Sequence, residues 1–258
     1  MIIDFSKYSS VRIGGKFELE ILDRVRDFEG VLIGGANNLL ISPAPKKMAI
    51  LGENFDFIKF LERDKTHALV RIGCKTKAAK IYRFAKENNL KGLEFLLKIP
   101  GTLGGLLRMN AGLKDENISH HLVKIMSARG EILREDVTFA YRFCPLTLPL
   151  FWAEFKLEWG FDDAKDVLLK SARSNQPSGA SFGSIFKNPP GNFAGALIEA
   201  AGLKGFERGG AMISDKHANF LINKGGASFE DAIFLIELAR SRVFEEFGVR
   251  LENEVIVL

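Results

Sequence analysis

Four glycines fall within residues 99–112, directly after an Ile-Pro pair. Pro100 fixes its own φ and favours an extended backbone at Ile99. The glycines can adopt positive φ, and because they have no Cβ they let a ligand approach the main chain. Successive unobstructed N–H groups in such a turn form a concavity that binds anions. The stretch predicts either a tight turn packed against a sheet or a surface for a phosphorylated cofactor. The four glycines are Gly101, Gly104, Gly105 and Gly112.

The spacing of these glycines excludes two common nucleotide-binding motifs. A Rossmann fingerprint needs G-x-G-x-x-G at the start of a helix that directly follows a strand. A Walker loop needs a terminal Gly-Lys-Ser/Thr, and no such triplet follows the stretch. If the stretch binds a phosphate, it does so in another kind of fold.

The composition is that of an ordinary globular protein, with 47% hydrophobic and 26% charged residues among 258. No apolar run approaches the roughly 18 residues that span a bilayer. The N-terminus lacks the basic and apolar regions of a signal peptide, so we expect a cytoplasmic protein without a membrane partner. Lys and Arg are interspersed with Asp and Glu and leave a net charge of +4. That balance favours a small anionic ligand over nucleic acid.

Metal ligands are scarce in the chain. Cys74 and Cys144 are the only cysteines, and the four histidines include no H-E-x-x-H arrangement. These residues provide neither a disulfide framework nor the paired spacing of metal ligands. We therefore expect no metal.

Short strands and helices in alternation predict an α+β protein. Apolar runs bounded by turn signals predict strands, and apolar positions at helical spacing predict helices. A mostly polar helix over 162–174 places the domain boundary near residues 160–175. The other predicted helices cover 77–89, 194–201 and 228–247, the last with a capping box at Ser228-Phe-Glu-Asp231. The predicted strands cover 17–22, 30–34, 39–42, 49–51, 68–72, 122–127, 131–133, 151–159, 219–223 and 249–258.

Three polar residues stand out against apolar or glycine-rich surroundings. Ser184 follows Gly183, Arg142 lies in the apolar run 137–144, and Glu254 lies in the last predicted strand. Each has a common structural explanation: a turn serine, an arginine whose head group reaches solvent and a solvated strand edge. Taken one at a time, these residues identify no reaction.

The order and the sequences of several short motifs resemble those of the UDP-N-acetylenolpyruvoylglucosamine reductase family, the UDP-N-acetylmuramate dehydrogenases. The resemblance runs from Arg12-Ile-Gly-Gly15 to the C-terminal Leu-Glu-x-Glu-Val. The short chain and its Lys-His-Ala-Asn-Phe sequence resemble the smaller subtype. The other motifs are Gly34-Gly-Ala-Asn-Asn-Leu-Leu40, Ile99-Pro-Gly-Thr-Leu-Gly-Gly105, Tyr141-Arg142, Gly183-Ser-Ile-Phe-Lys-Asn-Pro189 and Ser214-Asp-Lys-His-Ala-Asn-Phe220.

This resemblance implies an α+β fold of the p-cresol methylhydroxylase type, in which two α+β subdomains hold FAD and a C-terminal α+β domain binds substrate. We expect the FAD-binding domain over 1–160, with subdomains of about 1–55 and 56–160. The substrate-binding domain would cover 161–258, with Glu254 in its last strand. We expect a monomer.

The resemblance also implies which residues form the site. Arg142, Ser184 and Glu254 would carry the reaction, while Tyr141, Lys187 and Asn188 would contact the substrate. The implied FAD-binding residues are Gly34, Gly35, Asn37, Asn38, Ile99, Pro100, Gly101, Thr102, Gly104, Gly105, Asn110 and Gly112.

The implied reaction reduces the enolpyruvyl ether of UDP-N-acetylglucosamine to UDP-N-acetylmuramate, with NADPH as the hydride donor to FAD, in peptidoglycan precursor synthesis. Negative charge would develop beside the substrate carboxylate, which calls for fixed donors in a dry site. Arg142 and Glu254 would polarise that carboxylate, and Ser184 would supply a proton to carbon. Two alternatives stay open: another FAD oxidoreductase of the same fold, such as an oxidase of an alcohol or sugar, and a non-catalytic protein that binds nucleotide sugars.

The chain departs from the family pattern within and after the glycine stretch. Met109 replaces the usual Gln before Asn110, and Lys114 stands near the place of an aromatic Tyr-Gly pair. These changes predict altered local contacts to flavin or substrate, and they leave the three proposed catalytic residues in place.

Overall fold

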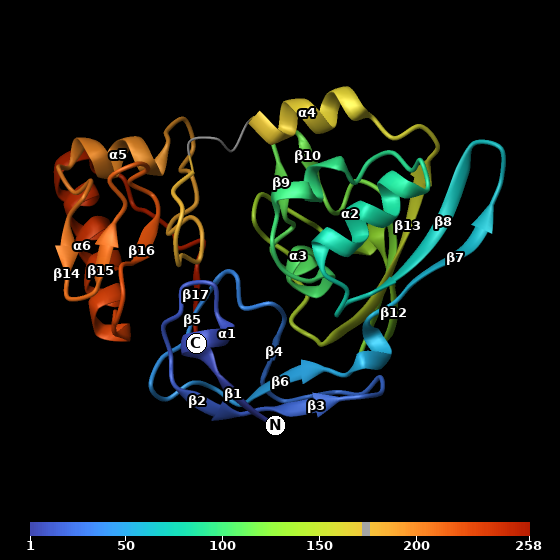
Figure 1. Ribbon diagram of the computed structural model, residues 1–258, viewed down its shortest axis with the longest axis horizontal. Helices are drawn as coiled ribbons and strands as arrows, with labels where there is room; N and C mark the ends of the chain where they lie inside the picture. The colour runs from blue at the N-terminus through green and yellow to red at the C-terminus, as the bar shows by residue number, and fades with distance from the viewer. Residues whose placement is uncertain (172–175) are drawn as a thin grey trace. The chain divides into compact units, whose positions relative to one another are not determined.

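The computed structural model describes residues 1–171 and 176–258, which form two compact units (Figure 1). Among the described residues, unit 1 contains Met1, 19–35 and 47–171. Unit 2 contains 2–18, 36–46 and 176–258. Each unit therefore combines segments that are far apart in the sequence.

An antiparallel sheet of five strands forms the centre of unit 1, in the order β12-β11-β13-β8-β7. Helices α2 (Ala78–Glu87) and α3 (Leu103–Arg108) share one buried core with this sheet (Figure 1). Ile81 and Ala85 are fully buried because they lie on one face of α2, four residues apart. The strands are β7 (Ile58–Arg63), β8 (His67–Gly73), β11 (Leu122–Ser127), β12 (Gly130–Leu133) and β13 (Leu150–Glu158).

The rest of unit 1 consists of smaller elements around this core. A parallel sheet in the order β3-β6-β4 comes from β3 (Glu20–Leu22), β4 (Val31–Ile33) and β6 (Met48–Leu51). Strands β9 (Gly112–Leu113) and β10 (Glu116–Asn117) form a hairpin directly after α3. Helix α4 covers Asp163–Ser171, and short 3₁₀ helices cover Glu53–Phe55, Glu94–Lys98 and Arg134–Asp136.

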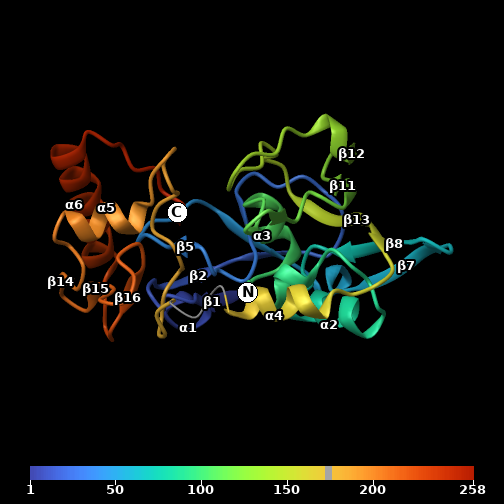
Figure 2. The same cartoon turned by 90° about the horizontal axis from the view of Figure 1, so that it is seen from above.

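Unit 2 combines two helices with a three-stranded antiparallel sheet. Helix α5 (Ala194–Ala200) lies beside α6 (Phe229–Phe247), as both views show (Figure 1, Figure 2). The sheet order is β14-β15-β16, over Glu207–Arg208, Ala211–Ile213 and Leu221–Asn223. The predicted capping box begins α6, with Ser228 and Asp231 each bonding the other's backbone. Gly248 ends the helix at φ 67°.

The N-terminal segments of unit 2 complete its core. Strand β1 (Ile2–Asp4) pairs with β2 (Lys16–Glu18), with the short helix α1 (Phe5–Tyr8) between them. Strand β5 (Leu39–Leu40) pairs in parallel with β17 (Ile256–Val257) at the other end of the chain. Val11, Ile13 and Leu40 are buried in the same cluster as the inner face of α6.

Two predicted strands are wrong in extent. Residues 17–22 form two strands, β2 and β3, because the chain passes from unit 2 to unit 1 at the buried Leu19. The strand predicted over 249–258 shortens to β17, because only Ile256 and Val257 pair with β5. Glu254 therefore lies in a bend before β17 and not within a strand.

Strand β13 is more deeply buried than its alternating sequence predicts. Every residue from Leu150 to Phe155 is buried. On the polar face, the Arg71 guanidinium lies 4.1 Å from the Trp152 ring centroid and donates hydrogen bonds to the Glu154 carboxylate. Long cationic side chains from neighbouring strands thus cover a face that the pattern assigns to solvent.

The middle of the glycine stretch is helical. Gly104 and Gly105 lie within α3, and Gly112 lies in β9. Of its four glycines only Gly101 has positive φ, at 112°. The stretch therefore contains no concavity built from successive positive-φ glycines.

Candidate active site

The two glycine-rich segments predicted to bind the cofactor meet within unit 1. A Cβ on Gly34 would lie 2.5 Å from Thr102 Oγ1 and 3.9 Å from the Gly105 nitrogen. Only glycine permits an approach this close to Thr102. The tertiary structure thus brings the segment after β4 against the start of α3.

Gly104 and Gly105 differ in what surrounds them. A Cβ on Gly104 would lie 3.3 Å from the Cys74 Cβ, whereas a Cβ on Gly105 would meet no atom within 4 Å. Gly104 therefore serves the packing of α3, while Gly105 leaves exposed backbone that a ligand can approach.

Asn110 follows α3 and is 7% exposed, with φ at 40°. Its Nδ2 donates a hydrogen bond to the Ala140 carbonyl at 3.1 Å. Its buried Oδ1 has no hydrogen-bond partner within the described residues. A buried acceptor without a donor is costly, so this atom points to a donor from a bound group.

Arg142 lies at the tip of a tight loop that Asn110 holds in place. The backbone groups of Ala140 and Phe143 bond each other reciprocally at 3.1 Å, and Arg142 adopts φ 54° between them. The Arg142 Nη2 donates to the Gly112 carbonyl at 3.0 Å, and its guanidinium lies 5.2 Å from the Tyr141 ring centroid. The apolar sequence around Arg142 predicts an anionic partner or solvent, and the structure adds a main-chain carbonyl to these.

Ser184 and Glu254 lie on adjacent segments of unit 2. The Ile185 carbonyl, next to Ser184, accepts hydrogen bonds from Glu254 N at 2.8 Å and Val255 N at 3.2 Å. Asn38 Nδ2 donates to the Glu254 carbonyl at 2.9 Å. The Asn37 carbonyl accepts a hydrogen bond from Ser10 Oγ at 3.3 Å. Unit 2 thus groups Ser184, Glu254 and Asn38, while Arg142 belongs to unit 1.

Comparison with known proteins relates the whole chain to one enzyme family. The family model "UDP-N-acetylenolpyruvoylglucosamine reductase, C-terminal domain" matches residues 175–258. A UDP-N-acetylenolpyruvoylglucosamine reductase of Campylobacter jejuni strain RM1221 is 71% identical over 100% of both chains. One of Helicobacter pylori strain J99 is 42% identical, over 99% of this chain and 98% of its own. The chain belongs to the UDP-N-acetylenolpyruvoylglucosamine reductase family.

A solved structure agrees with the sequence relatives of this reductase family. The UDP-N-acetylenolpyruvylglucosamine reductase of Thermus caldophilus superposes with a TM-score of 0.85, at 28% identity, over 100% of this chain and 98% of its own. The predictions of the family, of the α+β fold class, and of a reductase of peptidoglycan precursor synthesis are confirmed. The site residues and domain limits predicted from the resemblance stay predictions.

Asn219 belongs to the family motif Ser214-Asp-Lys-His-Ala-Asn-Phe220 and is buried. The sequence of the motif does not indicate which group Asn219 contacts. Its Oδ1 accepts from Phe186 N at 3.0 Å, and its Nδ2 donates to Phe186 O at 2.8 Å. The side chain thus pairs with one peptide unit as a neighbouring strand would. This pairing fixes the backbone two residues after Ser184.

The same motif forms its own turn before it reaches Asn219. Ser214 Oγ accepts from the backbone N–H of Lys216 and His217. Burial lowers the pKa of His217, whose Nδ1 accepts a hydrogen bond from Asn219 N at 3.3 Å. His217 Nδ1 therefore acts as a hydrogen-bond acceptor within a folded turn.

The residues predicted to contact substrate already have contacts inside the protein. Asn188 Oδ1 accepts from Ala194 N at 3.1 Å, at the start of α5, and Lys187 Nζ lies 3.4 Å from Glu252 Oε2. The Tyr141 side chain is 55% exposed.

Within the described residues, no cluster of His, Cys, Asp or Glu is arranged to hold a metal ion. No helix in the described part of the chain is long and apolar enough to cross a bilayer.

Proposed function

We propose that the chain binds FAD and, with NADPH as reductant, converts UDP-N-acetylglucosamine enolpyruvate to UDP-N-acetylmuramate. The observation that supports a bound cofactor is the buried Asn110 Oδ1, which needs a hydrogen-bond donor. It stands at the end of α3, after the exposed Gly105 backbone and the Gly34–Thr102 approach. These residues fit a large cofactor with hydrogen-bond donors and a phosphate chain.

Six of the predicted cofactor residues have a specific proposed role. Gly34, Gly35 and Gly105 offer bare backbone to the diphosphate, and Asn110 Oδ1 accepts from a flavin donor. Asn37 and Asn38 add amide groups at the diphosphate. When bound, FAD supplies the carrier that takes hydride from NADPH and passes it to the substrate.

Three side chains act on the substrate. The Arg142 guanidinium stabilises the negative charge that develops at the substrate carboxylate. Glu254 assists at the same group, which requires its carboxyl to hold or share a proton. Ser184 Oγ–H gives its proton to the substrate carbon, a transfer within reach of a weak acid because the acceptor is a strong base.

The remaining polar residues orient the substrate. Lys187 and Asn188 contact the nucleotide diphosphate or sugar, and Tyr141 offers an exposed ring beside Arg142. Because Asn188 Oδ1 is used at α5, its Nδ2 is the group that is proposed to bind substrate.

Anaerobic flavin re-oxidation tests the function directly. Purified protein should carry or take up FAD, lose the flavin absorbance when NADPH is added, and regain it when the UDP-enolpyruvyl sugar follows. A colourless protein that does not take up FAD would overturn the proposal. Re-oxidation by oxygen, with none by the enolpyruvyl sugar, would favour an oxidase of the same fold.

A further inference from the structure

The hairpin β9–β10 sets the position of the carbonyl that Arg142 uses. Arg142 Nη2 donates to Gly112 O, and Gly112 is the first residue of β9. A Cβ on Gly112 would lie 2.1 Å from the Glu116 carbonyl oxygen and 2.8 Å from the Asn117 Cβ. Strand β10 therefore lies directly against Gly112, so a shift of β10 moves the hydrogen-bond acceptor of Arg142.

This hairpin is too short to be stable without contacts to other parts of the protein. Each strand has two residues, with Leu113 opposite Glu116 and Gly112 opposite Asn117. Its turn places Lys114 at φ 57°, in the left-handed region that favours glycine. Isolated two-stranded hairpins are marginal in water even when longer, so side chains must fix this one.

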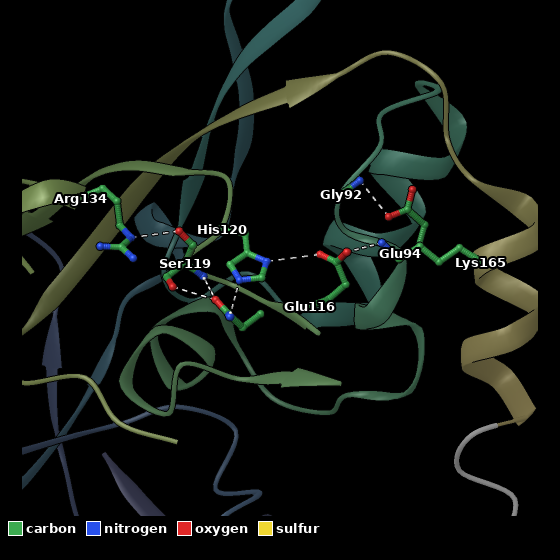
Figure 3. A network of polar contacts seen from close by, with 8 residues as sticks. Gly92, Glu94, Glu116, Ser119, His120, Arg134 and Lys165 are labelled. Atoms are coloured by element: carbon green, nitrogen blue, oxygen red, sulfur yellow. Dashed lines mark hydrogen bonds and ion pairs between the residues drawn. The ribbon is translucent and has the colours of Figure 1, made fainter. Parts of the chain in front are cut away.

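The side chain of Glu116 anchors strand β10 to other parts of unit 1. Figure 3 shows its carboxylate between His120 and Lys165, and Lys165 comes from α4. Oε1 accepts from Lys165 Nζ, and Oε2 lies 3.6 Å from His120 Nδ1. The side chains of Glu116 and Lys165 are 22% and 26% exposed. Such half-buried pairs are screened less than surface ion pairs.

Asn117, the next residue of β10, extends the network. Its Nδ2 lies 2.7 Å from His120 Nε2, and its Oδ1 accepts from Ser119 N at 3.1 Å and Ser119 Oγ at 2.7 Å. The Ser119 carbonyl accepts from Arg134 Nε at 3.1 Å. Both residues of β10 are thus held by side chains from outside the hairpin.

We propose that Glu116 is a positioning residue for Arg142: by tying β10 to His120 and to Lys165 of α4, it fixes the Gly112 carbonyl that orients the guanidinium. This inference rests on the proposed role of Arg142 in substrate reduction. Glu116 itself is not proposed to touch substrate or cofactor. Displacement of a reacting group by about 1 Å can cost on the order of 100-fold in rate, so a looser hairpin should slow the step that uses Arg142.

The test separates the two half-reactions of the FAD-loaded protein. Glu116→Gln keeps the shape of the side chain and removes its charge. We expect anaerobic flavin re-oxidation by the UDP-enolpyruvyl sugar to slow by about 10-fold, within the range for small misplacements, while flavin reduction by NADPH is unchanged. Lys165→Met removes the partner on α4 and should act in the same direction. An unchanged re-oxidation rate in both variants would overturn the proposal.

Asp163→Asn is the matched control. Asp163 Oδ1 pairs with Lys86 Nζ at 2.9 Å and so ties α4 to α2 without touching the hairpin. We expect the re-oxidation rate of this variant to stay within twofold of wild type. An equal slowing by Asp163→Asn would show that general loosening of α4 causes the effect, and would contradict the specific role of Glu116.

A double-mutant cycle decides whether Glu116 acts through Arg142. Arg142→Ala alone should slow re-oxidation, and adding Glu116→Gln should slow it no further. Effects that multiply would mean that Glu116 acts independently, which overturns the positioning role. If wild-type protein is not re-oxidised by the enolpyruvyl sugar at all, the proposed function fails first, and that outcome is distinct from a wild-type rate in Glu116→Gln.

Discussion

Ser184 offers the sharpest single-residue test of the reaction. Replacing it with Ala removes the proposed proton donor, so turnover should fall by roughly 10²-fold or more, the usual scale for a lost general acid. Flavin reduction by NADPH does not need this proton and should be unchanged. Stopped-flow measurement of each half-reaction separates the two effects.

Ser181→Ala is the control from the same segment. Ser181 Oγ accepts from Gly183 N at 3.1 Å, so this variant disturbs the turn without removing the proposed acid. We expect its turnover to remain within a few-fold of wild type. Equal rates in Ser184→Ala and wild type would reduce Ser184 to a turn residue.

Asn219 should matter for stability. In Asn219→Leu, the buried Phe186 N–H and carbonyl both lose their partner. Each unsatisfied buried group costs about 1–3 kcal/mol, so the loss of both should lower the free energy of unfolding by about 2–6 kcal/mol in urea titrations. Asn54→Ala removes an exposed hydrogen bond from Asn54 Nδ2 to the Asp23 carbonyl and should cost far less. A loss below 1 kcal/mol in Asn219→Leu would contradict the strand-like pairing.

The sequence predicts single residues by their type and predicts their partners poorly. Ser184, Arg142 and Glu254 are noticeable because their chemistry differs from that of their neighbours. Glu116 and Asn219 are ordinary residue types in polar segments. What distinguishes them is a partner 49 and 33 residues away, Lys165 and Phe186. Such pairings are fixed by the fold and leave no local pattern.

At the scale of elements, the turn between β7 and β8 predicts a measurable loss of folding stability in acid. The Asp64 Oδ1 accepts from Thr66 N at 2.6 Å, His67 N at 2.8 Å and Thr66 Oγ1 at 2.8 Å. Hydrogen bonds from the Thr66 and His67 backbone, followed by the Thr66 hydroxyl, lower the pKa of Asp64 from 3.8 to about 2. The charged carboxylate therefore stabilises this turn.

The sign of the pH effect follows from that shift. The unfolded chain binds the proton more readily, so the contribution of Asp64 is full above pH 3.8 and is lost as the pH falls toward 2. A carbon-detected NMR titration should give the Asp64 carboxyl a pKa well below 3.8. Asp64→Asn should flatten the dependence of stability on pH in this window. An ordinary pKa would contradict the hydrogen-bonded turn.

Elements whose boundaries depend on local signals were predicted well. The capping box at Ser228 and the glycine at 248 fix α6 almost to the residue, because both act within one turn of helix. Strand limits depend on distant partners instead. The predicted strand 249–258 shortens because β5, more than 200 residues earlier in the chain, offers only Leu39 and Leu40.

At the scale of the whole molecule, unit 2 draws its core from both ends of the chain. Val11, Ile13 and Leu40 are buried with the inner residues of α6. Asn223 Nδ2 donates to the Val11 carbonyl at 3.0 Å and to the Arg12 carbonyl at 3.1 Å. Composition changes along the chain do not reveal such long-range packing. Sequence alone therefore divides the chain into continuous segments.

The C-terminal fragment 175–258, which the family model matches as a domain, should therefore fail to fold cooperatively by itself. It lacks β5, so β17 has no partner, and its core loses three large apolar side chains from the N-terminal segments. Burying one such side chain contributes about 1.5–3 kcal/mol, and a fragment this short has little stability to lose. Circular dichroism melting and amide NMR spectra should show a weak, broad transition and poor dispersion. Co-expression with residues 1–46 restores the missing strand and side chains and should sharpen both. A sharp transition in the fragment alone would mean that α5, α6 and the β14-β15-β16 sheet form a sufficient core without the N-terminal segments.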